Sequence, residues 1–131
     1  AAAAGGPSQA DQAALEAETN EDTYIPPDLV HFSPGMAKFW VSFDNAGSIG
    51  SSYNTTSVSD DGTGNFAVTI GTDFSHADWV NHVTCDIGTG WARFANSDVR
   101  AEGTINIETK DQYANAADPG GEVQVAGWGD Q

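Results

Sequence analysis

The sequence has only four lysines and arginines, a single cysteine and two leucines among its 131 residues. Nineteen acidic residues against those four bases give a formal net charge of −15 at pH 7. A charge of this sign repels phosphate backbones and anionic lipid surfaces, so we expect no nucleic-acid partner. The charge suits a protein that works in saline water, where salt shortens the range of the repulsion between acidic side chains. The ordinary solubility of an acidic surface explains the charge equally well.

Two further absences narrow the class of protein. The lone Cys85 cannot form a disulfide within the chain, and we expect a small buried thiol, because no partner base lies near it in "DWVNHVTCDI". No apolar stretch approaches ~18 residues, and the sequence does not begin with a basic and then apolar pattern. We therefore expect neither a membrane-spanning helix nor a signal peptide.

The scarcity of leucine leaves valine, isoleucine and aromatic residues to build the core, which favours β structure. In residues 37–43, "AKFWVSF", alternation places Phe39, Val41 and Phe43 on one face. Residues 45–70 contain two extended runs joined by "SDDGTG", where Asp61-Gly62 signals a hairpin. Trp40 and Phe66, together with Phe39 or Phe43, are expected in the core because they lie in strands.

The rest of the sequence continues the β pattern. Residues 77–87 predict a strand, residues 88–98 a glycine-flanked loop or short strand, and residues 103–109 and 121–128 two more strands. Six or seven short strands separated by turns predict a compact antiparallel β-sandwich over residues 37–131.

Residues 1–36 have a different texture. The first ten, "AAAAGGPSQA", predict a flexible or partner-ordered tail. Residues 8–18 favour a short helix, with Ser8 as the N-cap and Asp11 in a weak capping-box position. Beyond it we expect a hinge with one helical turn, capped by Asp28 and ended by Pro34-Gly35. This segment would precede the β domain as a separate part of the chain.

Three stretches match one known pattern: residues 8–38, residues 37–70 and the ending "VQVAGWGDQ". In these places the sequence resembles the C-terminal domain of tailed-bacteriophage tail fibres and related virion proteins. The matching positions of the first stretch are Glu16, Thr19, Tyr24, Ile25 and Pro27. Those of the second are Ala37, Lys38, Trp40, Val41, Phe43, Asn54, Asp61, Gly62, Thr63, Gly64 and Val68.

The resemblance implies a homotrimer on the exterior of the virion, with adhesion rather than catalysis as its role. Residues 1–36 would attach to other virion proteins and trimerise, and residues 37–131 would form the head. One copy of the segment is too small to bury its larger apolar side chains, but three copies around an axis could pack them. The expected trimerisation residues are Leu15, Tyr24, Ile25, Leu29 and Val30.

The sequence offers little sign of chemistry. His31, His76 and His82 have no metal-ligand spacing, so we expect no metal and no cofactor. A trimer could still gather three copies of one histidine, or of Asp73 or Asp60-Asp61, around a cation. No G-x-S-x-G motif or P-loop is present, and paired carboxylates mean little among nineteen acids, so we expect no enzyme.

The best binding candidates lie in the glycine-flanked "GTGWARFANSD". Trp91 and Phe94, beside Arg93 and Asn96, could form an aromatic and polar platform that stacks on sugars or docks a protein receptor. Packing against a neighbouring protomer would explain them equally well. Tyr113 is a second loop candidate with the same two explanations.

The resemblance, taken with these candidate residues, implies a trimeric phage tail fibre or spike tip that attaches to a host-surface glycan or protein. A capsid head fibre or decoration protein with the same trimeric fold is the main alternative. A free carbohydrate-binding module is the second. None of the three involves nucleic acid or insertion into a membrane.

Overall fold

The computed structural model describes residues 6–19, 22–88 and 92–131. The chain divides into two compact units, Ala1–Met36 and Ala37–Gln131. Within the described residues, no helix is long and apolar enough to cross a membrane. The second unit, which we call the head, holds two four-stranded sheets.

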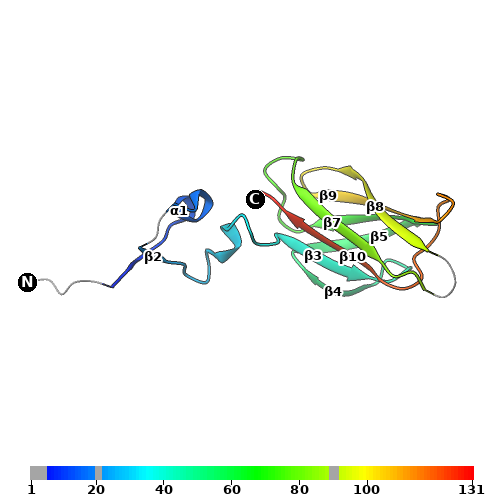
Figure 1. Cartoon of the computed structure of the whole chain (residues 1–131), viewed down its shortest axis with the longest axis horizontal. Helices are drawn as coiled ribbons and strands as arrows, with labels where there is room; N and C mark the ends of the chain where they lie inside the picture. Colours follow the sequence, from blue (N-terminus) through cyan, green and yellow to red (C-terminus); the bar gives the residue numbers. More distant parts are fainter. Residues whose placement is uncertain (1–5, 20–21, 89–91) are drawn as a thin grey trace, which may run out of the picture. The chain divides into compact units, whose positions relative to one another are not determined.

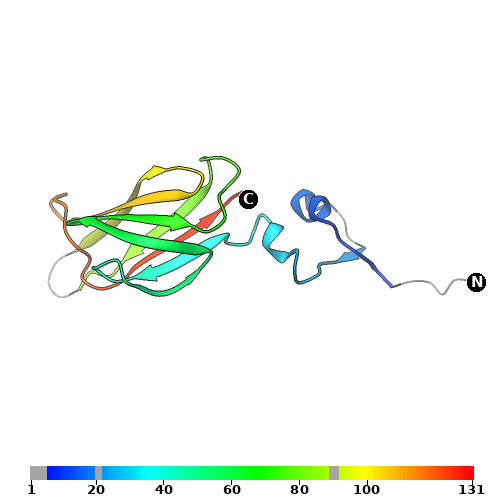
Figure 2. The same ribbon diagram turned by 180° about the vertical axis from the view of Figure 1, so that it is seen from behind.

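Both sheets of the head are antiparallel throughout (Figures 1 and 2). The first has the order β4-β3-β10-β7, and its strands are β3 (Phe39–Phe43), β4 (Ile49–Tyr53), β7 (Val80–Cys85) and β10 (Val123–Trp128). The second has the order β5-β6-β9-β8, and its strands are β5 (Thr55–Gly62), β6 (Asn65–Ile70), β8 (Arg93–Arg100) and β9 (Thr104–Asp111). The predicted mainly β, antiparallel class is confirmed.

A single core lies between the two sheets, because both contribute alternate side chains to one buried cluster. The rings of Phe43 on β3 and Phe66 on β6 meet across the gap with centroids 5.2 Å apart. The remaining buried members are Phe39, Val41, Val68, Ile70, Phe74, Trp79, Ile105, Ile107, Val123 and Val125. Valine, isoleucine and aromatic residues therefore build the core, as the composition predicted, and Cys85 packs half-buried against it.

Aromatic residues outside the strands close one end of the core. Phe74 and Trp79 stack with ring centroids 4.6 Å apart, and Phe39 meets Trp79 edge-on at 5.6 Å. The indole Nε1 of Trp79 donates to the carbonyl oxygen of Ala101 at 3.0 Å, which satisfies the polar atom of a buried ring. In addition, the guanidinium group of Arg100 donates a hydrogen bond to the backbone carbonyl oxygen of Trp79.

The chain changes sheets at Asn54, where the sequence predicted one continuous run. β4 ends at Tyr53 in the first sheet, and β5 begins at Thr55 in the second. Asn54 between them has a φ of 50°, in the left-handed region that asparagine tolerates better than most residues. One residue therefore turns the chain from one layer of the sandwich to the other.

The head has two distinct ends. Residue 37 lies at what we call the near end, where Phe39 of β3 pairs with Gly127 of β10. At the far end Phe43 pairs with Val123, and the linking segments converge. There Asp118 accepts from the amide of Gly64 at 2.8 Å, and the amide of Gly120 donates to the carbonyl oxygen of Asp86 at 3.0 Å. These contacts tie the two sheets together at the end opposite residue 37.

The amino-terminal unit, described by itself, contains a two-stranded parallel ladder of β1 (Ser8–Gln9) and β2 (Thr23–Tyr24). Helix α1 (Gln12–Ala17) begins after Asp11, whose Oδ1 accepts from the amide of Ala14 at 2.8 Å. Ser8, the predicted N-cap, is instead part of β1. That prediction is wrong because the carboxylate next to the first helical residue takes the capping position.

The predicted helical turn of this unit is present as the short 3-10 helix η1 (Val30–Phe32). It follows Leu29 and has no side-chain cap, so the predicted capping role of Asp28 is wrong. The amide of Leu29 instead bonds to the carbonyl oxygen of Pro26 at 3.0 Å. A backbone turn therefore starts this helix.

Candidate functional site

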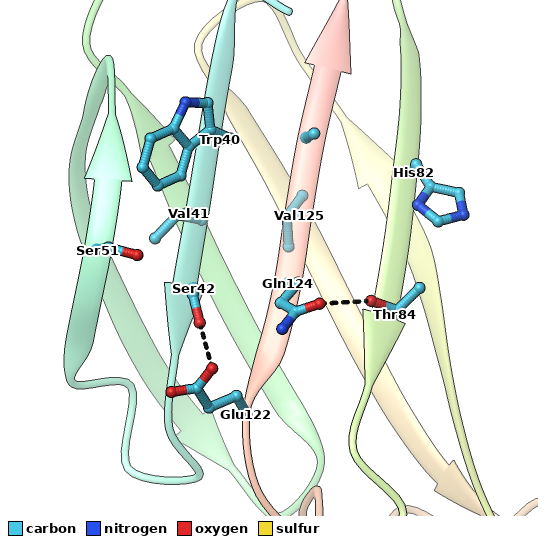
Figure 3. Close-up of a pocket in the computed structure, with 10 residues that line it drawn as sticks. Trp40, Val41, Ser42, Ser51, His82, Thr84, Glu122, Gln124 and Val125 are labelled. Atoms are coloured by element: carbon cyan, nitrogen blue, oxygen red, sulfur yellow. Dashed lines mark hydrogen bonds between the residues drawn. The ribbon is translucent and has the colours of Figure 1, made fainter.

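A hollow of about 570 Å³ lies on the outer face of the first sheet (Figure 3). We call it the outer-face hollow. Its side chains come from all four strands and from the residue just before β10. Those that face outward are Trp40, Ser42, Ser51, His82, Thr84, Glu122, Gln124 and Ala126.

The register of the strands sets these side chains in two parallel rows. Ala126 on β10 pairs with Trp40 on one side and with His82 on the other. One step along the face, Gln124 pairs with Ser42 on one side and with Thr84 on the other. Because paired residues project to the same side of a sheet, each row crosses three strands. The small Ala126 thus lies between two rings, and the polar row lies beside it.

Two hydrogen bonds fix the polar row (Figure 3). Ser42 Oγ donates to Glu122 Oε2 at 2.8 Å, and Thr84 Oγ1 donates to Gln124 Oε1 at 3.3 Å. Thr84 engages the oxygen of the Gln124 side-chain amide, so the NH₂ group is the part of that amide left to donate. Ser42 occupies one oxygen of the Glu122 carboxylate, so the other oxygen, Oε1, remains as an acceptor.

Trp40 corrects a prediction from the sequence. We expected it in the core, but 42% of its surface is exposed. Its neighbours Phe39 and Val41 face inward, so the pleat of β3 forces Trp40 outward. Tyr53 on β4 is the cross-strand partner of Trp40 and is also exposed, so two aromatic residues occupy neighbouring positions on this side of the sheet.

Of the residues predicted to bind a ligand, those that the structure describes lie elsewhere on the head. Trp91 lies outside the described residues. Phe94 and Asn96 are exposed at alternate positions of β8, on the outer face of the second sheet. Arg93 is half-buried, and its Nε donates to the carbonyl oxygen of Asp118 at 3.0 Å, so it helps to hold the far-end segment in place.

The structure brings three of these residues to the far end. Arg93 pairs with Asp111, and Phe94 pairs with Lys110 on β9. Tyr113 follows in the next turn, where its side chain is exposed and its amide donates to Asp111 Oδ1 at 2.8 Å. Asn96 pairs with Glu108, further from the end. Residues distant in sequence thus share one end of the β8–β9 pair.

The predicted trimerisation residues behave in two ways. Leu15 is only 8% exposed, so the expectation that one copy cannot bury it is wrong. It lines a small hollow of about 240 Å³ together with Ala10, Ala14 and Ile25, all within the amino-terminal unit. Tyr24 and Ile25 are about half exposed, Val30 is exposed, and Leu29 is half-buried.

Asp44, Asp111 and Cys85 are titratable groups of the head with shifted pKa values. Hydrogen bonds from the backbone of Ser48 and Ala46 lower the pKa of Asp44. Desolvation acts to raise the pKa of Asp111, but hydrogen bonds from Asn115 and Tyr113, with the charge of Arg93, outweigh it and lower that pKa. Burial, helped by the charge of Asp86, raises the pKa of the Cys85 thiol. The carboxylates of Asp44 and Asp111 accept hydrogen bonds from the backbone of the turns that follow them. At a given pH, a smaller fraction of Cys85 is ionised to thiolate than of a free cysteine.

No group of three histidine, cysteine or carboxylate side chains in the described part of the chain is arranged to hold a metal ion. Comparison with protein-family models, curated proteins and solved structures found no match to the chain. The geometry offers two candidate sites on the described part of the head, the outer-face hollow and the exposed residues of the far end.

No pattern in the sequence singles out the outer-face hollow. Its side chains come from residues 40–51, 82–84 and 122–126, and only the pairing of β3, β10 and β7 brings them together. The available signal was the alternation in residues 37–43, which already places Trp40 opposite the core-facing side chains.

Proposed function

We propose that this chain is a phage virion structural protein, the trimeric tip of a tail fibre or spike whose head contacts the host surface. The observation that carries the proposal is the position of the predicted binding residues. Arg93, Phe94 and Tyr113 lie at the far end of the head, opposite the end at which residue 37 begins. A head attached through residue 37 would carry these three residues at its opposite end, where they would meet the host surface.

The amino-terminal unit supports a role in assembly. It has only Ala10, Leu15 and Pro26 buried among its described residues. Tyr24, Ile25, Val30 and Met36 remain substantially exposed, which is a large apolar share for so small a unit. Three copies around an axis would cover such side chains.

Adhesion by such a head would depend on avidity. Three identical heads bind repeated surface ligands weakly one at a time, but the second and third contacts form at high effective concentration. A host surface carries many copies of each glycan or protein, so three weak sites give a stable attachment. The resemblance of residues 8–38 and 37–70 to tail-fibre domains supports the same role.

Solution mass tests the assembly step. Light scattering of the full chain is expected to give a trimer, whereas residues 37–131, which have their own core, are expected to be monomeric. In the full chain, Ile25→Ser is expected to shift the trimer toward monomer, because it removes a half-exposed apolar side chain. Thr19→Ser, an exposed position in the same unit, is the matched control. A full chain that stays monomeric at every concentration would contradict the trimer.

Labelling of intact phage particles tests the location. Antibody fragments against the head are expected to mark the tail. Marking of the capsid shell instead would replace the tail assignment with a head fibre or decoration protein, for which the same fold and trimer would serve. Particles that carry no label would overturn the virion role altogether.

A further inference from the structure

We propose that the outer-face hollow is a binding site for a neutral oligosaccharide. The inference deepens the proposed function by naming a ligand class, and it places the ligand on a face that the sequence did not single out. It rests on the side chains of the head alone. It would hold equally for a head on a tail, on a capsid or in a free module.

The first argument is the pair of exposed aromatic rings. Trp40 and Tyr53 are cross-strand neighbours, and both keep close to half of their surface in water. Large rings are normally buried because they remove so much apolar surface from water. The C–H faces of a sugar ring are apolar while its rim is polar, so an exposed indole beside hydrogen-bonding groups matches a sugar on both counts.

The second argument is the width and depth of the hollow. Trp40 and His82 lie on the strands that flank β10, so two strand spacings, about 10 Å, separate their backbones. Ala126 lies between them and has only a methyl group. A larger side chain at that position would fill the gap, so this alanine keeps the hollow open. The resulting space suits one sugar ring lying beside the indole.

The third argument is the polar row beside the rings. Gln124 and Glu122 are each held by a hydroxyl group, at 3.3 Å from Thr84 and 2.8 Å from Ser42. Their remaining polar atoms are one amide NH₂ and one carboxylate oxygen, a donor and an acceptor. A sugar hydroxyl accepts and donates, so adjacent hydroxyls can use both. Because these side chains are already fixed, binding costs little ordering entropy.

Charge selects a neutral ligand over an acidic one. Among the described residues that line the hollow there is no lysine or arginine, and Glu122 is one of them. The chain as a whole carries a formal charge of −15. A sulfated, phosphorylated or uronic-acid glycan would therefore meet repulsion without a counter-charge.

A protein partner fits this face less well than a sugar does. Interfaces between proteins centre on dry apolar and aromatic residues with a polar rim. At the hollow itself, the central strand β10 presents Ala126 and Gln124 and no large apolar side chain, and Trp40 lies to one side. The observations therefore favour a hydroxyl-rich ligand.

Nuclear magnetic resonance of the full isotope-labelled chain tests the proposal directly. The probes are the neutral maltohexaose, cellopentaose and mannohexaose, with hexagalacturonate as the acidic comparison. We expect saturable shifts of the Trp40 indole Nε1–H and the Gln124 side-chain amide with at least one neutral probe. We expect none at these groups with hexagalacturonate.

Variants locate the site. Trp40→Ala is expected to weaken binding about tenfold through loss of stacking, and Trp40→Phe is expected to restore part of it. Ala126→Leu fills the hollow and is expected to abolish binding. Gln124→Ala is expected to weaken binding, whereas Asn106→Ala, the matched amide on the outer face of the other sheet, should leave it unchanged. A dispersed amide spectrum and a thermal melt confirm that each variant is folded.

Three results would overturn the proposal. The first is that no neutral probe shifts these two groups at millimolar concentration. The second is that sugar-dependent shifts appear only at Phe94 or Tyr113, which would move the site to the far end. The third is that the same groups shift with protein concentration alone, which would make this face a contact between copies of the chain. If the antibody fragments fail to label phage particles, the virion role is contradicted, but the sugar-binding results are unaffected because they concern the head alone.

Discussion

The side-chain Nδ2 of Asn54 donates to the carbonyl oxygen of Lys38 at 2.9 Å. Asn54 is the residue at which the chain passes from β4 to β5, and Lys38 directly precedes β3. The amide of Lys38 in turn donates to the carbonyl oxygen of Gly127 on β10 at 2.8 Å. One side chain therefore fastens the passage between the sheets to the backbone where the head begins.

Replacement of Asn54 should separate its two contributions. Asn54→Ala loses the hydrogen bond and forces alanine into the left-handed region, so we expect the free energy of unfolding to fall by about 1–3 kcal/mol. Asn54→Gly loses the same bond without that strain and should cost less, because glycine adopts positive φ freely. Urea denaturation measures both. Equal costs for the two variants would show that the backbone conformation contributes nothing.

Removal of a core ring should be far more damaging than removal of a surface ring. Phe66 is 1% exposed and packs on Phe43, so Phe66→Ala is expected to lower the free energy of unfolding by about 3–5 kcal/mol. Phe94, 55% exposed, is the matched control, and Phe94→Ala should change it by at most about 0.5 kcal/mol. Chemical denaturation of both variants gives the comparison, and similar costs would contradict the assignment of the core.

Two glycines in the first sheet should respond oppositely to alanine. A Cβ at Gly127 would overlap the ring of Phe39 and lie 3.0 Å from Trp79 Cζ3, so Gly127→Ala should destabilise the head by about 1–3 kcal/mol. A Cβ at Gly50 would meet the carbonyl oxygen of Ser42 at an ordinary 3.7 Å. Gly50→Ala should therefore be neutral or slightly stabilising. The melting temperatures of the two variants test this explanation. A similar loss of stability in both would show that close packing around Gly127 is not the cause.

The hydrogen bonds of the turn at Asp44 should make the free energy of unfolding depend on pH in the acidic range. Its carboxylate accepts from the amides of Ala46 and Ser48, which holds its pKa below the usual 3.8. A folded-state pKa below the unfolded value adds stability that is fully present above pH 3.8 and is lost as pH falls through the folded pKa. The cost of Asp44→Ala should thus be largest at neutral pH and shrink in acid.

Melting temperatures across that pH range measure this effect. Asp61→Ala removes the same charge from an exposed position near the end of β5 and corrects for net charge alone. A cost of Asp44→Ala that is the same at neutral pH and in strong acid would contradict the role of the ionised carboxylate.

Local patterns in the sequence predicted most strands, because alternation and turn residues are properties of neighbouring residues. The same alternation placed Trp40 opposite Phe39 and Val41, yet strand position alone suggested a core role, and the pleat decides against it. The break at Asn54 was not predicted, since only the pairing of β4 with β3 and of β5 with β6 reveals it.

The outer-face hollow lay further beyond sequence reasoning. It needs Trp40, His82 and Ala126 in one row, and their register follows from long-range pairing that no local pattern encodes. The far-end residues were easier to suggest, because Arg93 and Phe94 adjoin each other in the sequence. Even there, the closeness of Tyr113 depends on the pairing of β8 with β9.

The position of β3 governs how the head would respond to pulling. The strand begins at residue 39, directly after the point at which the head joins the preceding segment, and it is hydrogen-bonded to β4 on one side and β10 on the other. A force applied at residue 37 and resisted at the far end acts along this strand. It must shear two ladders at once, because neither neighbour can peel away one bond at a time. A head built in this way passes tension through a central strand of its first sheet, the strand that also carries Trp40 and Ser42 of the outer-face hollow.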